Sequence, residues 1–309
     1  KRVQRLVYCT AAYESGSIRM ENSQGLDAQR SFDTSYIFAI PSVQDGDEVQ
    51  TGFAFRMGRD AADAEGCALE AVAEAVGKLG GKPVDSGCYR VLFKPYAFAD
   101  LLAAFSSMFS ADEAQKGRSL LAGKEGQPIA SALITLWDDP FDPVAPRAFD
   151  GEGTPCVKKA IIERGTLRTL LHNLKTANKQ GVKTTASASK SGYASSVSVA
   201  PTNFMIEPTA EPLEAMLNRL GDGLFITDVQ GMHSGADAIS GDFSLSAKGY
   251  LVEHGKIARA VNQITVGGNF FRVLNGIEAV GGDLKFALPG SSGFASPSIL
   301  IRSLSVAGK

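Results

Sequence analysis

One stretch, Gly221–Asp283, constrains the fold of this chain more than any other. From Phe243 to Lys248 apolar and polar residues alternate, which is the period of a strand with one buried face. Glu253–Lys256 has the composition of a hairpin turn, because its glycine can adopt a positive φ, and an apolar return strand follows over residues 261–266. Asn269 is a candidate N-cap for a helix that we place over Phe270–Val280. This order predicts an antiparallel sheet backed by a helix.

The rest of the chain extends this mixture of strands and covering helices. Apolar residues recur at helical spacing in three further segments, which predicts helices over Arg59–Leu79, Pro95–Phe109 and Leu213–Leu220. Strands are predicted over Leu6–Tyr13, Ser17–Glu21, Ser31–Ile40, Thr51–Met57, Tyr89–Phe93, Ala130–Leu136, Val157–Ile162, Leu167–Leu174, Asp283–Pro289 and Ser298–Val306. Gly, Pro, Asp and Ser cluster in Gly81–Gly87, so we place a domain boundary there. We expect an α+β protein with mostly antiparallel sheets and covering helices, in two packed domains over residues 1–86 and 87–309.

Composition limits the partners that this protein can have. Its 309 residues carry 31 basic and 33 acidic side chains, so no net positive field favours direct binding of nucleic acid. No apolar run approaches the roughly 20 residues that span a bilayer, and no signal-peptide pattern opens the chain. We therefore expect a cytoplasmic protein without a membrane partner, whose scattered cysteines are reduced thiols. These cysteines are Cys9, Cys67, Cys88 and Cys156.

The three histidines do not form a metal-binding pattern. A zinc peptidase commonly uses two histidines about one turn apart on a helix, with a glutamate beside the first. His172, His233 and His254 are far apart in the sequence. We expect His172, which lies among leucines, to be a hydrogen-bonded histidine at a strand edge, and His254 to be solvated in its turn. His233, in a glycine-rich turn, stays open as a site residue.

Other candidate sites have a structural alternative that the residues favour. Ser292, in Gly-Ser-Ser-Gly, lacks the spacing of a hydrolase nucleophile elbow and has no evident His-Asp partner. Ser187–Ser191 contains a lysine, so Ser-Lys catalysis is conceivable on composition alone. Gly267–Asn269 could cradle an anion before a helix, although a structural turn explains it better. The Ser- and Thr-rich segment Thr184–Val199 is either a solvated loop or the border of a cleft.

An ordered series of motifs resembles the PmbA/TldD family, whose members are named as modulators of DNA gyrase and form a two-subunit metalloprotease. No single motif is specific, but the series covers essentially the whole chain. The motifs are Asn22–Gly25, Phe149–Gly153, Gly165–Leu167, Pro201–Asn203, Ser240–Ser244, Gly249–Ile257 and Ile264–Asn269. Family members carry a further domain before the matched region, so the resemblance implies that this chain is a fragment lacking that domain.

The resemblance implies a branch without its own catalytic site. Proteolytic members carry a His-Glu-x-x-x-His run on one helix and a cysteine near the C-terminus as metal ligands. The corresponding positions here are Ala103, Ala104, Met108 and Ser292. Methyl and thioether groups cannot replace two imidazoles and a base, so this is the pattern of the PmbA branch, also called TldE. It implies no catalytic residue, no bound metal and no cofactor.

We therefore expect a non-catalytic subunit of a TldD/TldE-like metalloprotease, which shapes a cavity for a peptide or unfolded-segment substrate. Its partner would be a second copy or a TldD-like catalytic subunit, and we predict a two-fold dimer through the strand-rich segment Leu224–Gly268. Two alternatives stay open. The first is a peptide hydrolase in its own right with unrecognised ligands. The second is a regulatory protein that acts on DNA gyrase, an alternative that rests on the family's name alone.

Overall fold

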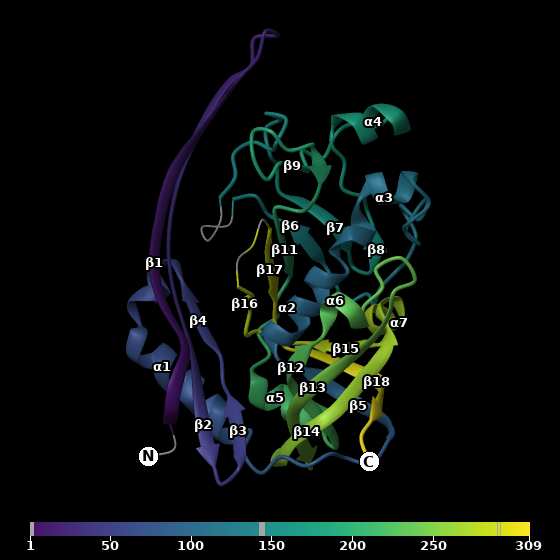
Figure 1. The fold of residues 1–309 in the computed structure, drawn as a ribbon. Coiled ribbons are helices and arrows are strands. Elements are labelled where there is room, and N and C mark those ends of the chain that lie inside the picture. Colours follow the sequence, from purple (N-terminus) through teal and green to yellow (C-terminus); the bar gives the residue numbers. More distant parts are fainter. Residues whose placement is uncertain (1–2, 142–145, 289, 291) are drawn as a thin grey trace.

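The computed structural model describes residues 3–141, 146–288, 290 and 292–309. It contains three larger sheets and covering helices, and most strand pairs are antiparallel, so the predicted α+β class is confirmed (Figure 1). Within the described residues, no helix is both long enough and apolar enough to cross a bilayer.

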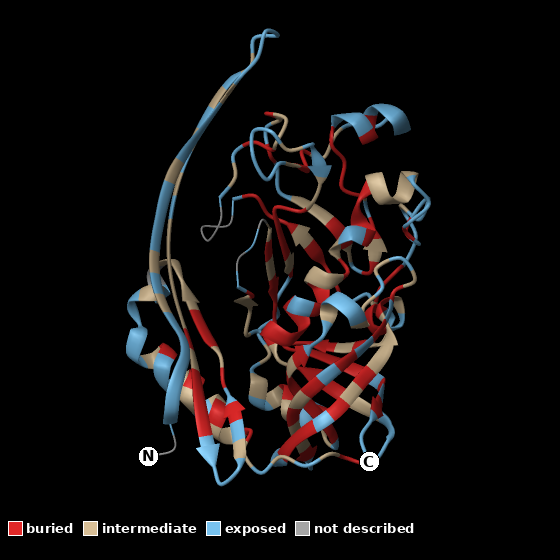
Figure 2. Cartoon of the chain, in the orientation of Figure 1, coloured by how far each residue is buried: buried red, intermediate tan, exposed pale blue. Residues whose placement is uncertain are grey.

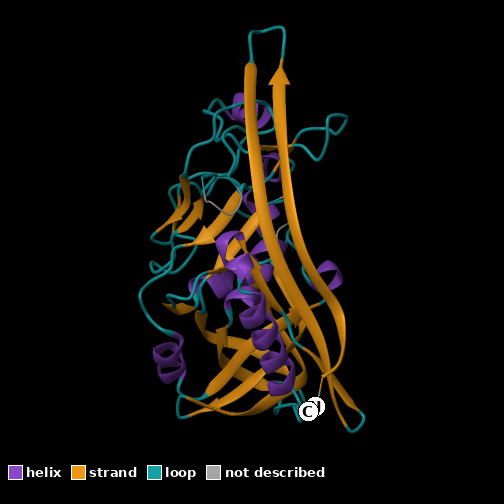
Figure 3. Cartoon of the chain, turned by 90° about the vertical axis from the view of Figure 1, so that its left-hand side faces the viewer, coloured by secondary structure: helices purple, strands orange, loops and turns teal. Residues whose placement is uncertain are grey.

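The N-terminal part of the chain forms a long hairpin on a small base. β1 (Val3–Glu21) and β2 (Asp27–Asp45) pair along their whole length and rise along one side of the molecule (Figures 1 and 3). β3 (Glu48–Thr51), β4 (Ala54–Met57) and helix α1 (Ala64–Gly77) cover the lower part of β2. Burial follows this arrangement, because the base of β2 is buried whereas the upper hairpin is mainly exposed (Figure 2). The hairpin is therefore an arm that extends from the base.

Three predicted boundaries in this part were wrong for identifiable reasons. The first two predicted strands are one continuous strand that runs through Gly16, which pairs with Phe32. Glycine fits there because a Cβ at this position would lie 2.8 Å from the Phe32 ring. β2 continues through Pro41, where a register shift in the pairing with β1 accommodates the residue that lacks an N–H donor. The predicted helix begins at Ala64 and not at Arg59, because Asp63 accepts a hydrogen bond from the Gly66 backbone as its N-cap.

Strands between Gly87 and Ala307 build a barrel. β5 (Gly87–Phe93), β12 (Gly223–Gln230), β13 (Asp242–Glu253), β14 (Lys256–Asn269) and β18 (Ile299–Ala307) form one sheet, and β14 closes it by pairing with β18. β15 (Ile277–Val280) pairs antiparallel with β18. The predicted helix over Leu213–Leu220 is confirmed as α5, which packs on β5. The predicted turn between β13 and β14 is confirmed, with Gly255 at a φ of 75°.

The helix expected over Phe270–Val280 is shorter than predicted. α7 (Phe270–Asn275) begins as expected at Asn269, whose side chain accepts a hydrogen bond from the Phe271 backbone. It ends before Gly276, because the apolar residues that follow form β15 and pair with β18. An apolar run of this length fits either a helix or a strand, and the long-range pairing with β18 decides between them.

A second mixed sheet lies above the barrel in Figure 1. It is formed by β16 (Lys285–Phe286), β17 (Gly293–Ser296), β11 (Asn203–Ile206), β6 (Leu136–Asp138), β7 (Lys159–Glu163) and β8 (Thr166–Leu167), in that order. Pro289, at the end of one predicted strand, lies outside the described residues. The strand expected over Leu167–Leu174 was wrong, because the chain turns into helix α4 (Leu174–Gln180) behind a capping box formed by Asn173 and Thr176.

Shorter elements complete the fold. Those of the upper part are α3 (Ala111–Gln115), β9 (Ala188–Ser189) and β10 (Ser198–Val199), whereas α6 (Met232–Gly235) connects β12 to β13 of the barrel.

Helix α2 (Pro95–Ala104) joins the barrel to the upper sheet. It begins at the predicted proline but ends earlier than predicted, and a 3₁₀ turn over Ser106–Phe109 follows. The Phe105 ring stacks 4.6 Å from the Phe270 ring, at the end of the barrel. Phe109 meets Phe204 of the upper sheet edge-on at 5.5 Å. This aromatic packing fixes α2, the helix that the resemblance singles out, between the barrel and the upper sheet.

Candidate functional site

The fold brings together the two segments that the resemblance singles out. Helix α2 packs against β17, the strand that begins directly after Ser292. Ala103 and Ala104 are half-buried at the end of α2, and Met108 is buried in the core. The Ser292 hydroxyl donates a hydrogen bond of 2.6 Å to the Pro201 carbonyl. These positions therefore offer two methyl groups, a thioether and a hydroxyl that is already hydrogen-bonded. Ser291 lies outside the described residues.

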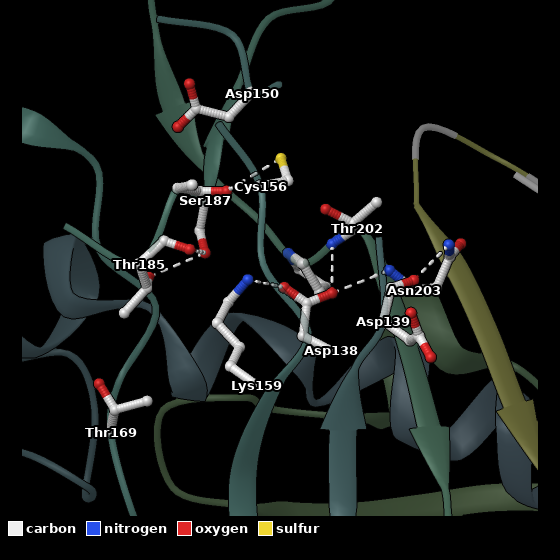
Figure 4. A network of polar contacts seen from close by, with 12 residues as sticks. Asp138, Asp139, Asp150, Cys156, Lys159, Thr169, Thr185, Ser187, Thr202 and Asn203 are labelled. Atoms are coloured by element: carbon white, nitrogen blue, oxygen red, sulfur yellow. Dashed lines mark hydrogen bonds and ion pairs between the residues drawn. The ribbon is translucent and has the colours of Figure 1, made fainter. Parts of the chain in front are cut away.

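A buried polar network joins the strands of the upper sheet (Figure 4). Asp138, which is fully buried, accepts hydrogen bonds from the backbone N–H groups of Thr202 and Asn203 at 2.8 and 2.9 Å. Its other oxygen lies 2.8 Å from the ammonium group of Lys159. The Thr202 carbonyl in turn accepts a hydrogen bond from the Gly293 backbone. The network therefore connects β6, β7 and β11 to the start of β17.

Glycine is required where β17 approaches this network. A Cβ at Gly293 would lie 2.3 Å from Asn203 Oδ1, a distance that no ordinary contact allows. The residues Asp138 and Lys159 were missed at the level of sequence, because only the fold brings them together. The motif Pro201–Asn203 was the available signal, since its backbone supplies the donors to Asp138.

Each histidine lies on a different part of the fold. His172 is buried, and burial lowers its pKa. Its Nδ1 has no hydrogen-bond partner among the described residues, whereas a backbone hydrogen bond at Thr176 acts in the opposite direction on its pKa. His233 is exposed on α6, and the His254 side chain is 93% exposed in the hairpin turn, as expected. Among the residues that the structure describes, no three His, Cys, Asp or Glu side chains are grouped as metal ligands would be.

The remaining candidate nucleophiles are already occupied by structural contacts. Ser187 is buried and its hydroxyl lies 2.9 Å from that of Thr185. Lys190 donates to the Tyr193 carbonyl at 2.9 Å, so the residues 187–191 do not form a Ser-Lys pair. Burial also raises the pKa of the Cys156 thiol to about 11, which keeps it protonated near neutral pH.

A cleft opens between the N-terminal base and the barrel. It has a volume of about 270 Å³ and is lined by residues of β2, β3, α1, α2 and β12 and by Ala287 and Leu288. Its polar and aromatic lining includes Thr51, Phe53, Glu74, Lys78, Tyr96, Asp100, Thr227 and Asp228. Composition and periodicity gave no sign of this cleft, because its walls come from segments that are distant in the sequence.

Ion pairs cross the cleft from α1 to the barrel. The Lys78 side chain is only 4% exposed, and its ammonium group lies 2.8 Å from Glu74 and 3.6 Å from Asp228. It also donates to the Thr51 carbonyl at 3.2 Å. Glu74 lies 2.5 Å from Lys94, which directly precedes α2. Because these groups are largely shielded from water, their attraction is screened less than that of a surface pair.

Asp100 of α2 lines the cleft and has a raised pKa. Its side chain is exposed within the hollow, yet the surrounding protein displaces enough water to disfavour the charged form. This desolvation, together with repulsion from Asp228, raises the pKa of Asp100 to about 6. Among the described residues, its carboxylate has no hydrogen-bond or ion-pair partner.

Comparison with known proteins identifies relatives over most of the chain. Residues 86–308 match the family described as the PmbA/TldA metallopeptidase C-terminal domain. An uncharacterised protein of Methanocaldococcus jannaschii is 33% identical over 264 residues, which are 84% of this chain and 61% of that protein. The metalloprotease PmbA of Escherichia coli O157:H7 is 25% identical over 272 residues, which are 86% of this chain and 57% of that protein. This chain therefore spans about three fifths of the length of these curated relatives.

Two solved structures share the fold over nearly the whole chain. A Thermotoga maritima protein described as a proposed modulator of a DNA gyrase is 36% identical, with a TM-score of 0.88, and the match covers 98% of this chain and 70% of that one. TldE from Thermococcus kodakarensis is 25% identical, also with a TM-score of 0.88, and the match covers 96% of this chain and 68% of that one.

Proposed function

Because the chain belongs to the PmbA/TldD family of metallopeptidases, we propose that it is a non-catalytic subunit that shapes the peptide-accepting cavity of a two-chain metalloprotease. The observation that carries this proposal is the end of α2. Ala103, Ala104 and Met108 stand there at the positions for which the family resemblance implies metal ligands and a base. The packing of α2 against β17 supports the same assignment for Ser292.

The residues at these positions do not fit a metal ion. Zinc binds to imidazole nitrogen, thiolate sulfur or carboxylate oxygen, and neither methyl groups nor a buried thioether in an apolar core supplies an equivalent set. The Ser292 hydroxyl is committed to the Pro201 carbonyl. The cleavage step is therefore assigned to a partner chain of the TldD type, and this chain contributes walls and peptide contacts to the shared cavity.

Reconstitution with a TldD-like catalytic subunit tests the proposal. Hydrolysis of an unfolded reporter peptide is measured for this chain alone, for the catalytic subunit alone and for the mixture. We expect activity in the mixture only, and its loss when the first histidine of the catalytic subunit's His-Glu-x-x-x-His run is replaced by alanine. Peptide hydrolysis by this chain alone, retained after repeated purification, would refute the assignment and favour a hydrolase in its own right.

A further inference from the structure

The cleft between α1 and α2 carries one more negative charge than its own residues neutralise. The carboxylates of Glu74, Asp100 and Asp228 accompany the ammonium groups of Lys78 and Lys94. Both lysines pair with Glu74, and Lys78 also meets Asp228. Asp100 is left without a cationic partner among the described residues. Its charge is therefore available to a cation that enters the cleft.

Charged groups on the other elements around α2 have different contacts. Lys285 of β16 pairs with Glu70 at 3.3 Å. Lys248 of β13 donates to Gln50 at 3.1 Å. His233 of α6, which packs on α2, is exposed. None of these contacts involves the Asp100 carboxylate, so the surplus charge is not removed by a neighbour in the described part of the chain.

The size and walls of the cleft limit what can enter it. A volume of about 270 Å³ corresponds to roughly nine water molecules at about 30 Å³ each, and is slightly below the usual range for ligand pockets. Phe53 and Tyr96 meet edge-to-face at 5.6 Å and form an aromatic wall. The cleft therefore suits a small cationic group with one neighbouring side chain, and is too small for an extended peptide strand.

We propose that this cleft binds the free α-ammonium group of a peptide, with the carboxylates of Asp100 and Asp228 as its acceptors. An ammonium group has three donors, and charge-assisted bonds to carboxylates are among the stronger polar contacts. The first side chain of the peptide would then lie against Tyr96 and Phe53. This inference rests on the proposed function, because it takes a peptide as the ligand, and it names the end of the peptide that this chain holds.

Binding of short peptides to the full chain tests the inference. Isothermal titration at pH 7.5 compares Ala-Phe-Ala amide, its N-acetylated form, and an N-acetylated peptide in which lysine replaces the phenylalanine. We expect the free-amine peptide to bind and acetylation to weaken binding at least tenfold. Equal binding of the acetylated peptide, or binding of the lysine peptide alone, would overturn the assignment to an α-ammonium group. So would the absence of binding by all three peptides.

Two variants locate the binding in the cleft. Asp100→Asn should weaken binding of the free-amine peptide at least tenfold, because it removes the unpaired charge and keeps the shape. The matched control is Asp85→Asn, whose side chain is 81% exposed and lies outside the cleft, and it should bind as the unaltered chain does. Unchanged binding by a folded Asp100→Asn variant would refute the inference. The measurement needs no catalytic subunit, so its result is independent of whether reconstitution yields a protease.

Discussion

The ammonium group of Lys78 lies 3.6 Å from the carboxylate of Asp228, and this ion pair connects helix α1 of the N-terminal base to strand β12 of the barrel. Two elements that are distant in the sequence are thereby held on either side of one cleft. Because Lys78 is 4% exposed, removing its charge would leave the neighbouring carboxylates without their counter-ion in a poorly hydrated place.

We predict that Lys78→Met destabilises the protein by about 3 kcal/mol, the usual cost of breaking a buried ion pair from one side. Urea unfolding followed by circular dichroism measures the change. Lys116→Met is a matched control, because Lys116 pairs with Asp112 at the same helical spacing but is 47% exposed; we expect a loss of about 0.5 kcal/mol there. Equal losses in the two variants would contradict a buried network at the cleft.

The titration of Asp100 gives a pH-dependent prediction. Its folded-state pKa of about 6 lies above the unfolded value of about 3.9. Between these values the folded state binds more protons, so the contribution of Asp100 to stability decreases as the pH rises from about 4 to about 6. Asp100→Asn should therefore stabilise the protein above pH 6, by at most about 1 kcal/mol because solvent screens an exposed carboxylate, and should have no effect at pH 4.

Thermal unfolding at several pH values measures this difference. The Asp85→Asn variant should show no such dependence, since Asp85 is exposed. If the stabilisation by Asp100→Asn instead increased as the pH falls, the folded-state pKa of Asp100 could not be raised, and the prediction would be contradicted.

The absence of paired ligands leads to a prediction about metal content. We expect the purified chain to hold no stoichiometric zinc after dialysis against a weak chelator. The variant that combines Ala103→His, Ala104→Glu, Met108→His and Ser292→Cys should bind zinc more tightly, because it supplies imidazole and thiolate donors at the positions that the family resemblance indicates. Elemental analysis checks both statements. About one zinc per unaltered chain would contradict the first.

The sheet edge on which a dimer was expected is covered only in part. We expected the segment Leu224–Gly268 to expose an edge; β12 and β13 have neighbours on both sides, and β14 pairs with β18 over Thr265–Gly267. Within the described residues, β1 is the long strand whose second side is unpaired along its whole length. Its apolar side chains are exposed, with Leu6 at 57%, Tyr8 at 62% and Tyr13 at 68%. Such an edge usually requires a partner.

We therefore predict a two-fold dimer in which two β1 strands pair antiparallel. Centred on Tyr13, this pairing sets Arg5 of one copy opposite Glu21 of the other, because both lie eight residues from the centre. Light scattering should give about twice the chain mass of 32.5 kDa, and the double variant Tyr8→Lys, Tyr13→Lys should lower it. Tyr193→Lys is the control, because Tyr193 is 98% exposed on a different loop. A mass of one chain across a wide concentration range would contradict the dimer.

Local signals predicted the elements that depend on neighbouring residues. The turn at Gly255, the N-cap at Asn269 and the proline that opens α2 all have their effect within a few residues, and all three appear in the structure. The start of α4 could have been found in the same way, because Asn173 and Thr176 form a capping box that the sequence displays. Local signals did not distinguish a helix from a strand in short apolar runs. Residues Ile277–Val280 were predicted as helix and form strand β15.

The site was predictable only in part, for a different reason. The resemblance indicated Ala103 and Ser292 as positions that belong together, and the packing of α2 on β17 brings their segments together. The cleft beside Asp100 depends on contacts between α1, α2 and β12, and such contacts leave no local pattern in the sequence. The raised pKa of Asp100 follows from those same contacts, so it too required the fold.

The pairing of β5 with β18 has a consequence for how the protein is made. β5 lies between β12 and β18 in the barrel, yet more than half of the chain separates β5 from β18 in the sequence. During synthesis one edge of β5 therefore stays unpaired until β18 has left the ribosome. Pairings of such high contact order form slowly and expose aggregation-prone edges in the meantime. Chaperone binding to nascent chains should therefore be strongest after β5 has emerged and should end when β18 closes the barrel.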